Sequence, residues 1–168
     1  MALMKILSIP DPKLRVETTP VEIIDDNLQK IIDDMFETMY DAPGVGLAST
    51  QVGLGMRMAV IDVSQTKDQP LVLINPEIID AKDFTKMDEG CLSVPGHYDT
   101  VTRATWVKMK ALDRDGKEYT LEAEGLLAEA IQHEIDHLDG KIYIDQLSSF
   151  KQRRIKEKVK KFVKKRHA

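Results

Sequence analysis

The stretch GLLAEAIQHEIDHLDG, residues 125–140, decides how the rest of the chain is organised. It predicts a helix from Gly125 to Leu138, and Gly140 suits the position just after the end of such a helix. Apolar residues fall on most sides of this helix, which is typical of a buried helix. We therefore predict that it is central and that the other elements pack around it.

Apolar periodicity and turn residues predict the remaining elements. They are a short helical turn at Asp11-Pro12, a helix at 26–40 that Ala42-Pro43-Gly44 ends, strands at 57–63 and 71–75, a hairpin at 105–123 with its turn at Asp115-Gly116, and a last helix from Ser148 or Ser149 to Lys165. Strands first and a helix placed late favour the α+β class. We predict one domain over residues 1–168, with antiparallel β-sheets packed around the central helix, an N-terminal helix and a basic C-terminal helix.

The composition is that of a globular protein. Of 168 residues, 42% are apolar and 31% are charged, and the single cysteine, Cys91, excludes an intramolecular disulfide. The longest apolar runs fall well below the roughly 18 residues that a membrane span needs. The first fifteen residues do not have the pattern of a secretory signal. We therefore expect a cytoplasmic protein that binds neither a membrane nor DNA.

The charge is distributed unevenly along the chain. Residues 151–168 carry ten Lys or Arg and one acid, Glu157, although the net charge of the whole chain is −4. A basic segment on an acidic body favours an anionic partner for that segment. The alternative is a solvated basic face, with the apolar stripe of the same helix packed on the body.

His133, Glu134 and His137 form the strongest chemical pattern. Residues four apart on a helix lie about 6 Å apart on one face, so both imidazoles can bind one metal ion. Glu134 lies close enough to contact a water on that metal without being a ligand. The simpler alternative to a metal site is two buried histidines that only form hydrogen bonds. On a buried helix, the glutamate beside them would then also need hydrogen-bond partners, because burying an unpaired polar group is costly. The pattern favours a metal site in a hydrolytic enzyme.

A catalytic metal usually takes three protein ligands, so a third must lie elsewhere. A third histidine after Gly140 would complete a metzincin-type peptidase pattern, but that position is Tyr143. Glu157 has the spacing of a thermolysin-like third ligand, yet it is flanked by lysines, as on a solvated face. Cys91 offers a thiolate in a glycine-containing turn, where the backbone can approach a ligand closely. These arguments favour Cys91 and leave Glu157 as the alternative.

The glycine-rich segment GVGLASTQ, residues 44–51, has a simpler interpretation as a turn. A phosphate-binding loop is the other interpretation, but the segment lacks the Gly-Lys-Ser/Thr ending. It also follows a predicted helix rather than a strand, so it fits neither nucleotide-binding pattern.

Three segments in order resemble the signature motifs of the peptide deformylases: GVGLASTQ (44–51), EGCLSVPGHYDTVTR (89–103) and QHEIDHLDG (132–140). The similarity extends along the whole chain, and an α+β catalytic domain is implied. Ser49 replaces a usual alanine, Glu129 and Ala130 replace more apolar or thiol residues of some relatives, and Tyr98 stands where some have arginine. These departures concern the pocket rather than the reaction.

The resemblance implies a metal-dependent hydrolase that removes the formyl group from N-formylmethionine of nascent polypeptides and releases formate. Cys91, His133 and His137 would hold one Fe²⁺ per chain, and Ni²⁺, Co²⁺ or Zn²⁺ could also occupy the site. Deformylases with similar basic C-terminal helices dock on the ribosome, which makes the ribosome a candidate partner. A zinc endopeptidase that uses Glu157 and a non-catalytic, ribosome-bound metalloprotein remain as alternatives.

The same resemblance implies the roles of the other site residues. Glu134 would be the general base, and the Gln51 amide and the Leu92 backbone N–H would hold the oxyanion. Leu126, Val45 and His133 would line the methionine pocket. The substrate-binding residues would be Gly44, Val45, Gly46, Glu89, Tyr98 and Leu126.

Overall fold

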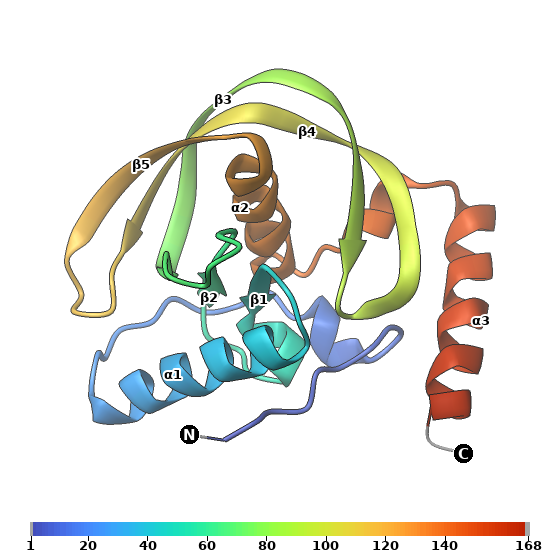
Figure 1. Cartoon of the computed structure of the whole chain (residues 1–168), viewed down its shortest axis with the longest axis horizontal. Helices are drawn as coiled ribbons and strands as arrows, with labels where there is room; N and C mark the ends of the chain where they lie inside the picture. Colours follow the sequence, from blue (N-terminus) through green and yellow to red (C-terminus); the bar gives the residue numbers. More distant parts are fainter. Residues whose placement is uncertain (1, 167–168) are drawn as a thin grey trace.

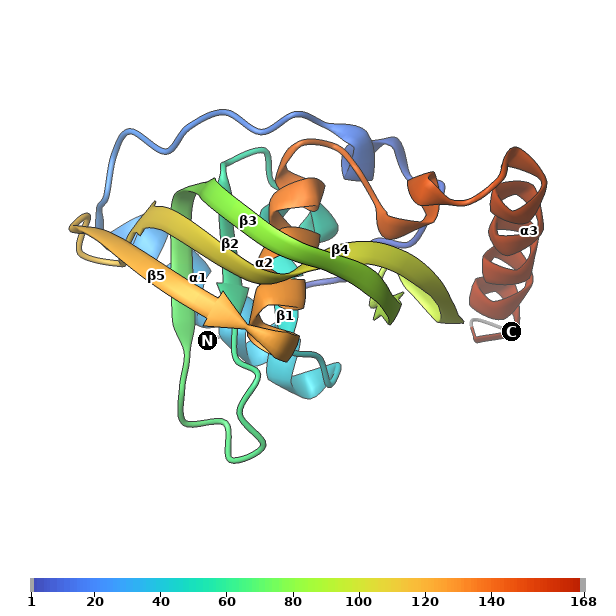
Figure 2. The ribbon, with the colours of Figure 1, turned by 90° about the horizontal axis from the view of Figure 1, so that it is seen from above.

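One antiparallel sheet organises the fold, as Figures 1 and 2 show in a computed structural model that describes residues 2–166. Its five strands are β1 (Gly46–Ala48), β2 (Met58–Ile61), β3 (Leu71–Cys91), β4 (Val94–Leu112) and β5 (Glu118–Glu124). They neighbour one another in chain order, and each neighbouring pair is antiparallel. The sheet is therefore a meander in which β1 and β5 are the edge strands.

The long strands β3 and β4 arch over helix α2 (Gly125–Leu138) (Figure 1). Their pairing begins at Ile74↔Leu112 and ends at Cys91↔Val94, with register shifts at three places. Such β-bulges bend a strand pair and increase its twist. At the first shift Asn75 has a φ of 52°, a left-handed conformation that asparagine tolerates better than most residues. These bends allow β3 to turn back toward α2, so that Cys91 at its end lies near the helix.

The sequence prediction missed residues 76–91 of β3 and 94–104 of β4, which were not predicted as strand. For β3, the physical reason is that the middle of the strand has no buried face. Residues 82–86 are exposed at consecutive positions, so their side chains do not alternate between apolar and polar. In β4, positions 97, 99, 101 and 103 are more buried than the positions between them, but His97, Asp99 and Arg103 are polar, so the sequence shows no apolar alternation there either.

Helix α2 packs between the sheet and the rest of the core. Ala128, Ile131 and Leu138 are fully buried and belong to a cluster with apolar residues of β1 to β5. The Gln132 side chain donates to the Ala104 carbonyl and accepts from the Ala104 amide, both at 2.9 Å. These two bonds fix the position of α2 along β4.

Two further helices flank this core (Figure 2). Helix α1 (Asp26–Asp41) begins where the Asp25 side chain accepts from the Leu28 amide, and its apolar face packs on β1 and β2. Helix α3 (Ser149–Arg166) packs on the β4 side through Ile155 and Val159. Short 3-10 helices lie at Pro12–Arg15, Ser49–Val52 and Tyr143–Gln146.

The predicted α+β architecture is confirmed, with one sheet instead of several within residues 2–166. Helix α2 has the predicted bounds, and α1 and α3 each extend one residue beyond them. Residues 1, 167 and 168 of the predicted domain lie outside the described residues. Within the described chain, no helix combines the length and the apolar composition that crossing a membrane requires.

Candidate metal centre

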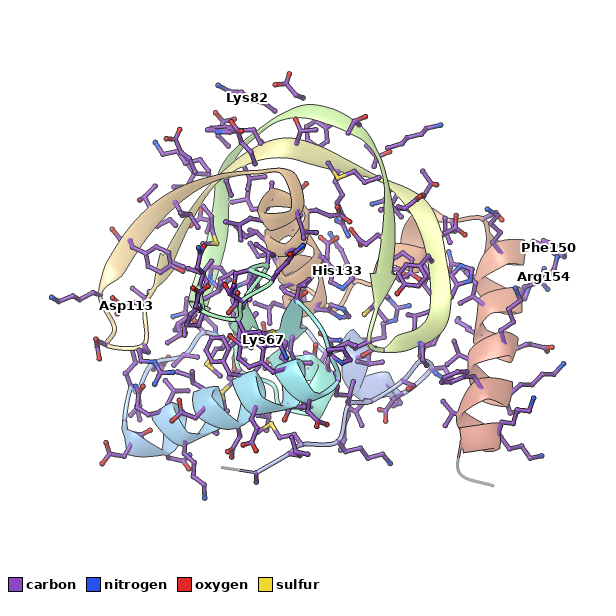
Figure 3. The ribbon with its side chains drawn as sticks, viewed as in Figure 1. Lys67, Lys82, Asp113, His133, Phe150 and Arg154 are labelled. Carbon is purple, nitrogen blue, oxygen red and sulfur yellow. The ribbon has the colours of Figure 1, made fainter. Side chains whose placement is uncertain are left out.

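Cys91, His133 and His137 meet although they come from distant parts of the sequence. Cys91 ends β3, and both histidines lie on α2 under the arch, where Figure 3 labels His133. The Cys91 Sγ atom lies 3.2 Å from His137 Nε2, and the three potential ligand atoms lie within 4.8 Å of one another. These are the three residues that the family resemblance implied as metal ligands.

The donor set fits one divalent transition-metal ion. A thiolate with two imidazoles suits Zn²⁺ and Fe²⁺, and a tetrahedral ion with bonds of about 2.0–2.3 Å needs its donors roughly 3.5 Å apart. The observed separations require only small side-chain shifts to reach that value. Glu157 is exposed on α3 and is not part of this cluster, and the buried Tyr143 hydroxyl donates to the His97 carbonyl. The geometry thus favours Cys91 as the third ligand.

Glu89, which is itself bound by Arg103, fixes the orientation of the His133 ring. His133 Nδ1 lies 2.7 Å from Glu89 Oε2, so its other ring nitrogen, Nε2, remains available to a metal. Arg103 donates to both Glu89 oxygens, at 2.9 and 2.7 Å, and to Asp136 at 2.6 Å. Burial raises the pKa of Glu89, but the bonds from His133 and Arg103 outweigh burial and hold it at about 2.

This arrangement differs from the role that the sequence suggested for Glu89. It was placed among the substrate-binding residues, whereas both of its oxygens bond to His133 and Arg103. Orienting a metal ligand is the role that this geometry supports. Sequence analysis did not single out Arg103, and its only signal was its place at the end of the motif EGCLSVPGHYDTVTR.

The electrostatic environment of the two histidines suits a cation. Burial lowers the pKa of His137 well below its ordinary value, which keeps the ring neutral, as a ligand must be. Burial also works to lower the pKa of His133, but the nearby charges of Glu134 and Cys91 raise it. Negative charge that stabilises a protonated His133 ring also stabilises a metal ion bound at its Nε2 atom.

Glu134 lies beside the cluster against the backbone of Gly46. A Cβ atom at position 46 would overlap the Glu134 carboxylate, so only glycine permits this approach. Glu134 is 3% exposed, and no hydrogen bond from a described residue reaches its buried Oε1. Burial raises the pKa of Glu134 to about 7, near the value that suits a general base at neutral pH.

Gln51 is held at the site with its amide oriented. Its Oε1 accepts from the Ala48 amide at 2.9 Å, and its Nε2 donates to Ser93 Oγ at 3.1 Å. The same Nε2 lies 3.6 Å from Cys91 Sγ. Leu92 directly follows Cys91, and a Cβ atom at position 44 would lie 2.7 Å from its Cδ1, so Gly44 makes room for that side chain.

A cleft of about 1440 Å³ opens onto the cluster. Every residue that the sequence assigned to the substrate or to catalysis lines it, as do the candidate ligands Cys91 and His133, whereas His137 is fully buried. Val45, Leu126 and Tyr98 are partly or largely exposed in its wall. Sequence analysis missed the N-terminal segment 3–12, which forms another wall, because nothing in its composition marks it as a binding element.

Comparisons with known proteins identify the family of this chain. The polypeptide deformylase family pattern matches residues 3–153. The chain is 55% identical to the peptide deformylase of Cellvibrio japonicus over 162 residues, which is 96% of both chains. A crystal structure of a peptide deformylase from Legionella pneumophila superposes with a TM-score of 0.96 at 50% identity, covering 99% of this chain and 98% of that one.

A second structural neighbour agrees with the first. The peptide deformylase of Ehrlichia chaffeensis in complex with actinonin has a TM-score of 0.92 at 40% identity, covering 96% of this chain and 98% of that chain. The identity, the coverage and the fold agree over nearly the full length. The chain belongs to the polypeptide deformylase family.

Proposed function

We propose that this enzyme removes the N-formyl group of nascent polypeptides at the centre formed by Cys91, His133 and His137. Deformylation is the reaction of its family, which is metal-dependent. One observation carries the assignment of the centre: three donors of the right type lie within 4.8 Å of one another beside a buried glutamate. The metal, when bound, would supply Lewis acidity toward a water and the formyl oxygen.

Glu134 is the proton carrier in this proposal. It accepts a proton from the attacking water and later passes the proton to the leaving amine. Its position against Gly46 holds the carboxylate in the cleft, and its burial raises its pKa, which favours acceptance of a proton. In this role Glu134 is a base and does not bind the metal.

The Gln51 amide and the Leu92 backbone N–H stabilise the charge that develops on the formyl oxygen. Donors that are already oriented cost no reorganisation when the charge appears, which is why such groups accelerate acyl transfer strongly. Gln51 meets this requirement because its carbonyl is bonded to Ala48 and its amide to Ser93. Because Nε2 carries two N–H groups, one can stay on Ser93 Oγ while the other, on the side of Cys91 Sγ at 3.6 Å, donates to a bound oxyanion.

The substrate enters as an extended chain beside β1. Strand β1 is an edge of the sheet, and Val45 and Gly46 at its start line the cleft. An edge strand offers free backbone groups to an extended peptide. The methionine side chain would then pack against Val45, Leu126 and the His133 ring, and Gly44 and Tyr98 would border the same path. We expect the enzyme to act in the cytoplasm, where nascent chains are made.

The proposed ion is Fe²⁺, with Ni²⁺, Co²⁺ or Zn²⁺ able to take its place, because a thiolate with two imidazoles binds all of them. Metal content tests the ligand set. Cys91→Ala should lose the metal and Glu157→Ala should keep one metal per chain. If Cys91→Ala retained the metal and Glu157→Ala lost it, the deformylase centre would be contradicted. The endopeptidase alternative, with Glu157 as the third ligand, would then be supported.

A ribosome contact through α3 is a second part of the proposal. Phe150 is 60% exposed with the Arg154 guanidinium 5.7 Å from its ring, and Figure 3 shows both on the side of α3 that faces away from the body. Lys158 and Lys161 continue this side at helical spacing and are exposed. Clustered cations of this kind fit the phosphates of ribosomal RNA.

The test of the ribosome contact must leave α3 folded, because Ile155 and Val159 are buried in the core. Replacing Arg154, Lys158 and Lys161 by Gln should weaken cosedimentation with ribosomes and leave formate release from a short peptide unchanged. Unchanged cosedimentation would mean that this basic face is only solvated. Deleting residues 151–168 is a poorer test because it also removes core residues.

A further inference from the structure

Two short segments from distant parts of the sequence carry the proposed oxyanion donors. Gln51 lies in the 3-10 turn Ser49–Val52, here called the Gln51 turn, and Leu92 lies in residues 91–95, here called the Cys91 loop. Gln51 Nε2 donates to Ser93 Oγ at 3.1 Å, and the Ser93 N–H donates to Cys91 Sγ at 3.4 Å. A shift of one segment relative to the other would therefore move the Gln51 amide away from the site where the oxyanion forms.

The other bonds of the Gln51 turn do not fix its distance from the Cys91 loop. The hydroxyl groups of Ser49 and Thr50 donate to carbonyl groups of Met56 and His137, which lie outside that loop. Within residues 2–166, no backbone hydrogen bond joins the Gln51 turn directly to the Cys91 loop. Their relative position needs a further support.

The N-terminal segment supplies this support through its backbone. The Leu7 N–H donates to the Gln51 carbonyl at 2.7 Å, and the Ile9 N–H donates to the Ser93 carbonyl at 2.9 Å. Gln51, Ser93 and Ile9 are almost fully buried, so losing either bond would leave a buried acceptor unpaired. Two residues of chain span at most about 7 Å, so this bridge limits how far the two carbonyl groups can move apart.

The bridge is itself anchored at both ends. On one side, the Met4 N–H donates to Thr38 Oγ1 of α1 at 2.9 Å. On the other side, the Ile9 side chain packs in a buried cluster with Val94 and Ile155. The segment between these anchors can therefore hold the two catalytic segments in place instead of moving with them.

We propose that the N–H groups of Leu7 and Ile9 make the N-terminal segment a spacer that sets the position of Gln51 relative to the Cys91 loop. Leu7 and Ile9 are positioning residues, because they act on the reaction through Gln51. This inference rests on the proposed deformylase function and deepens it. The oxyanion donor then depends on a segment that lies outside the three motifs.

An ester in place of the peptide bond at Leu7 tests the spacer, because it removes the N–H and keeps the side chain. The α-hydroxy acid analogue of leucine introduces this ester. It should lower kcat for formyl-Met-Ala-Ser by about 10- to 100-fold, since a displacement of about 1 Å can cost 10²-fold. KM should stay within about twofold, with one metal per chain, because substrate binding and the metal ligands are unchanged. The same ester at Ile9 should act in the same way.

A double-mutant cycle shows whether this loss passes through Gln51. In Gln51→Ala the oxyanion donor is already absent, so the ester at Leu7 should lower kcat by less than about a further twofold. A general disturbance of the fold would instead lower kcat by the same factor in both backgrounds. The second result would overturn the inference.

A second readout does not depend on turnover. The side-chain amide NMR signals of Gln51 in the Zn²⁺-loaded enzyme, identified by their absence from Gln51→Ala, should shift with the ester at Leu7. The matched control is an ester at Glu17, which is exposed, does not line the cleft and donates its N–H to no described residue. This control should change neither kcat nor the Gln51 signals.

The spacer and the proposed function fail in different ways. Unchanged kcat and unchanged Gln51 signals with the ester at Leu7 overturn the spacer while formate release by the wild-type enzyme stands. Absence of formate release from the wild-type enzyme overturns the proposed function, and the NMR comparison then still decides whether the segment positions Gln51.

Discussion

The Nδ1 atom of His133 lies 2.7 Å from Glu89 Oε2, and this bond determines which ring nitrogen is left to face the cleft. The Glu89 carboxylate is in turn held by two bonds from Arg103. A chain of buried polar contacts thus connects the substrate side of α2 with β3 and β4. Such partners commonly contribute 10- to 100-fold to metal affinity.

Glu89→Gln should therefore weaken metal binding by about 10- to 100-fold, because it loses the charge that fixes His133. It should also destabilise the fold by about 3 kcal/mol, since the buried Arg103 then lacks its charge partner. Metal competition titrations and urea unfolding measure the two effects. Asp136→Asn is the matched control, because Asp136 bonds to Arg103 but not to His133. Equal losses of affinity in both variants would contradict the positioning role of Glu89.

Gln51→Ala should lower kcat by about 10²–10³, the usual cost of removing an oxyanion donor. Ser93→Ala removes the present hydrogen-bond partner of the Gln51 amide and should cost far less, since Ser93 does not stabilise the developing charge. Steady-state kinetics with formyl-Met-Ala-Ser measure both variants. A loss in kcat below fivefold in Gln51→Ala would show that Gln51 does not stabilise the oxyanion.

Gly46→Ala should impair catalysis because the new methyl group would overlap the Glu134 carboxylate. Displacement of a catalytic group by about 1 Å can cost 10²-fold in rate. The control is Gly55→Ala, where an added Cβ meets no atom within 4 Å. Comparable activity in the two variants would show that Glu134 does not need its place against β1.

Acid should weaken the fold partly through Asp62. Burial works to raise the pKa of Asp62, but bonds from Ser64 and from the Tyr40 hydroxyl at 2.5 Å hold it below its ordinary value. A carboxyl whose pKa is lower in the folded state stabilises the fold fully above its unfolded pKa of about 3.9. This stability is lost as the pH falls through the folded pKa.

Asp62→Asn should consequently flatten the fall of the urea midpoint between about pH 5 and pH 2, although the variant is less stable at neutral pH. The comparison uses the slope of the midpoint against pH, not its absolute value. The same slope in the variant and the wild type would mean that Asp62 is not a source of acid sensitivity.

The local parts of the site could be predicted from the sequence. His133, Glu134 and His137 lie within two helical turns, so their spacing alone determines that they share a face. The bounds of α2 were predicted correctly because its apolar pattern is continuous and Gly140, with a φ of 77°, follows it. The meeting of Cys91 with this helix depended on its turn context and on the family resemblance.

The long-range parts could not be predicted in the same way. Residues 82–86 in the middle of β3 are all exposed and lack an alternating pattern, so the path that returns Cys91 to α2 could not be predicted. The bonds between Arg103 and Glu89 depend on that path, because they join side chains of β3 and β4 that are four positions apart in the register: Arg103 pairs with Thr85, and Glu89 pairs with Asp99. The charge of Glu129 was noticed only as a departure, and its place in the cleft wall emerged from the fold.

Formate release from formyl-Met-Ala-Ser by the wild-type enzyme and by Glu134→Ala, with metal content measured in the same samples, tests the account most directly. The account predicts that the wild-type enzyme releases formate. It predicts that Glu134→Ala keeps one metal per chain at Cys91, His133 and His137 and loses nearly all turnover. Near-wild-type turnover in the metal-loaded variant, or no formate from the wild-type enzyme, would contradict it.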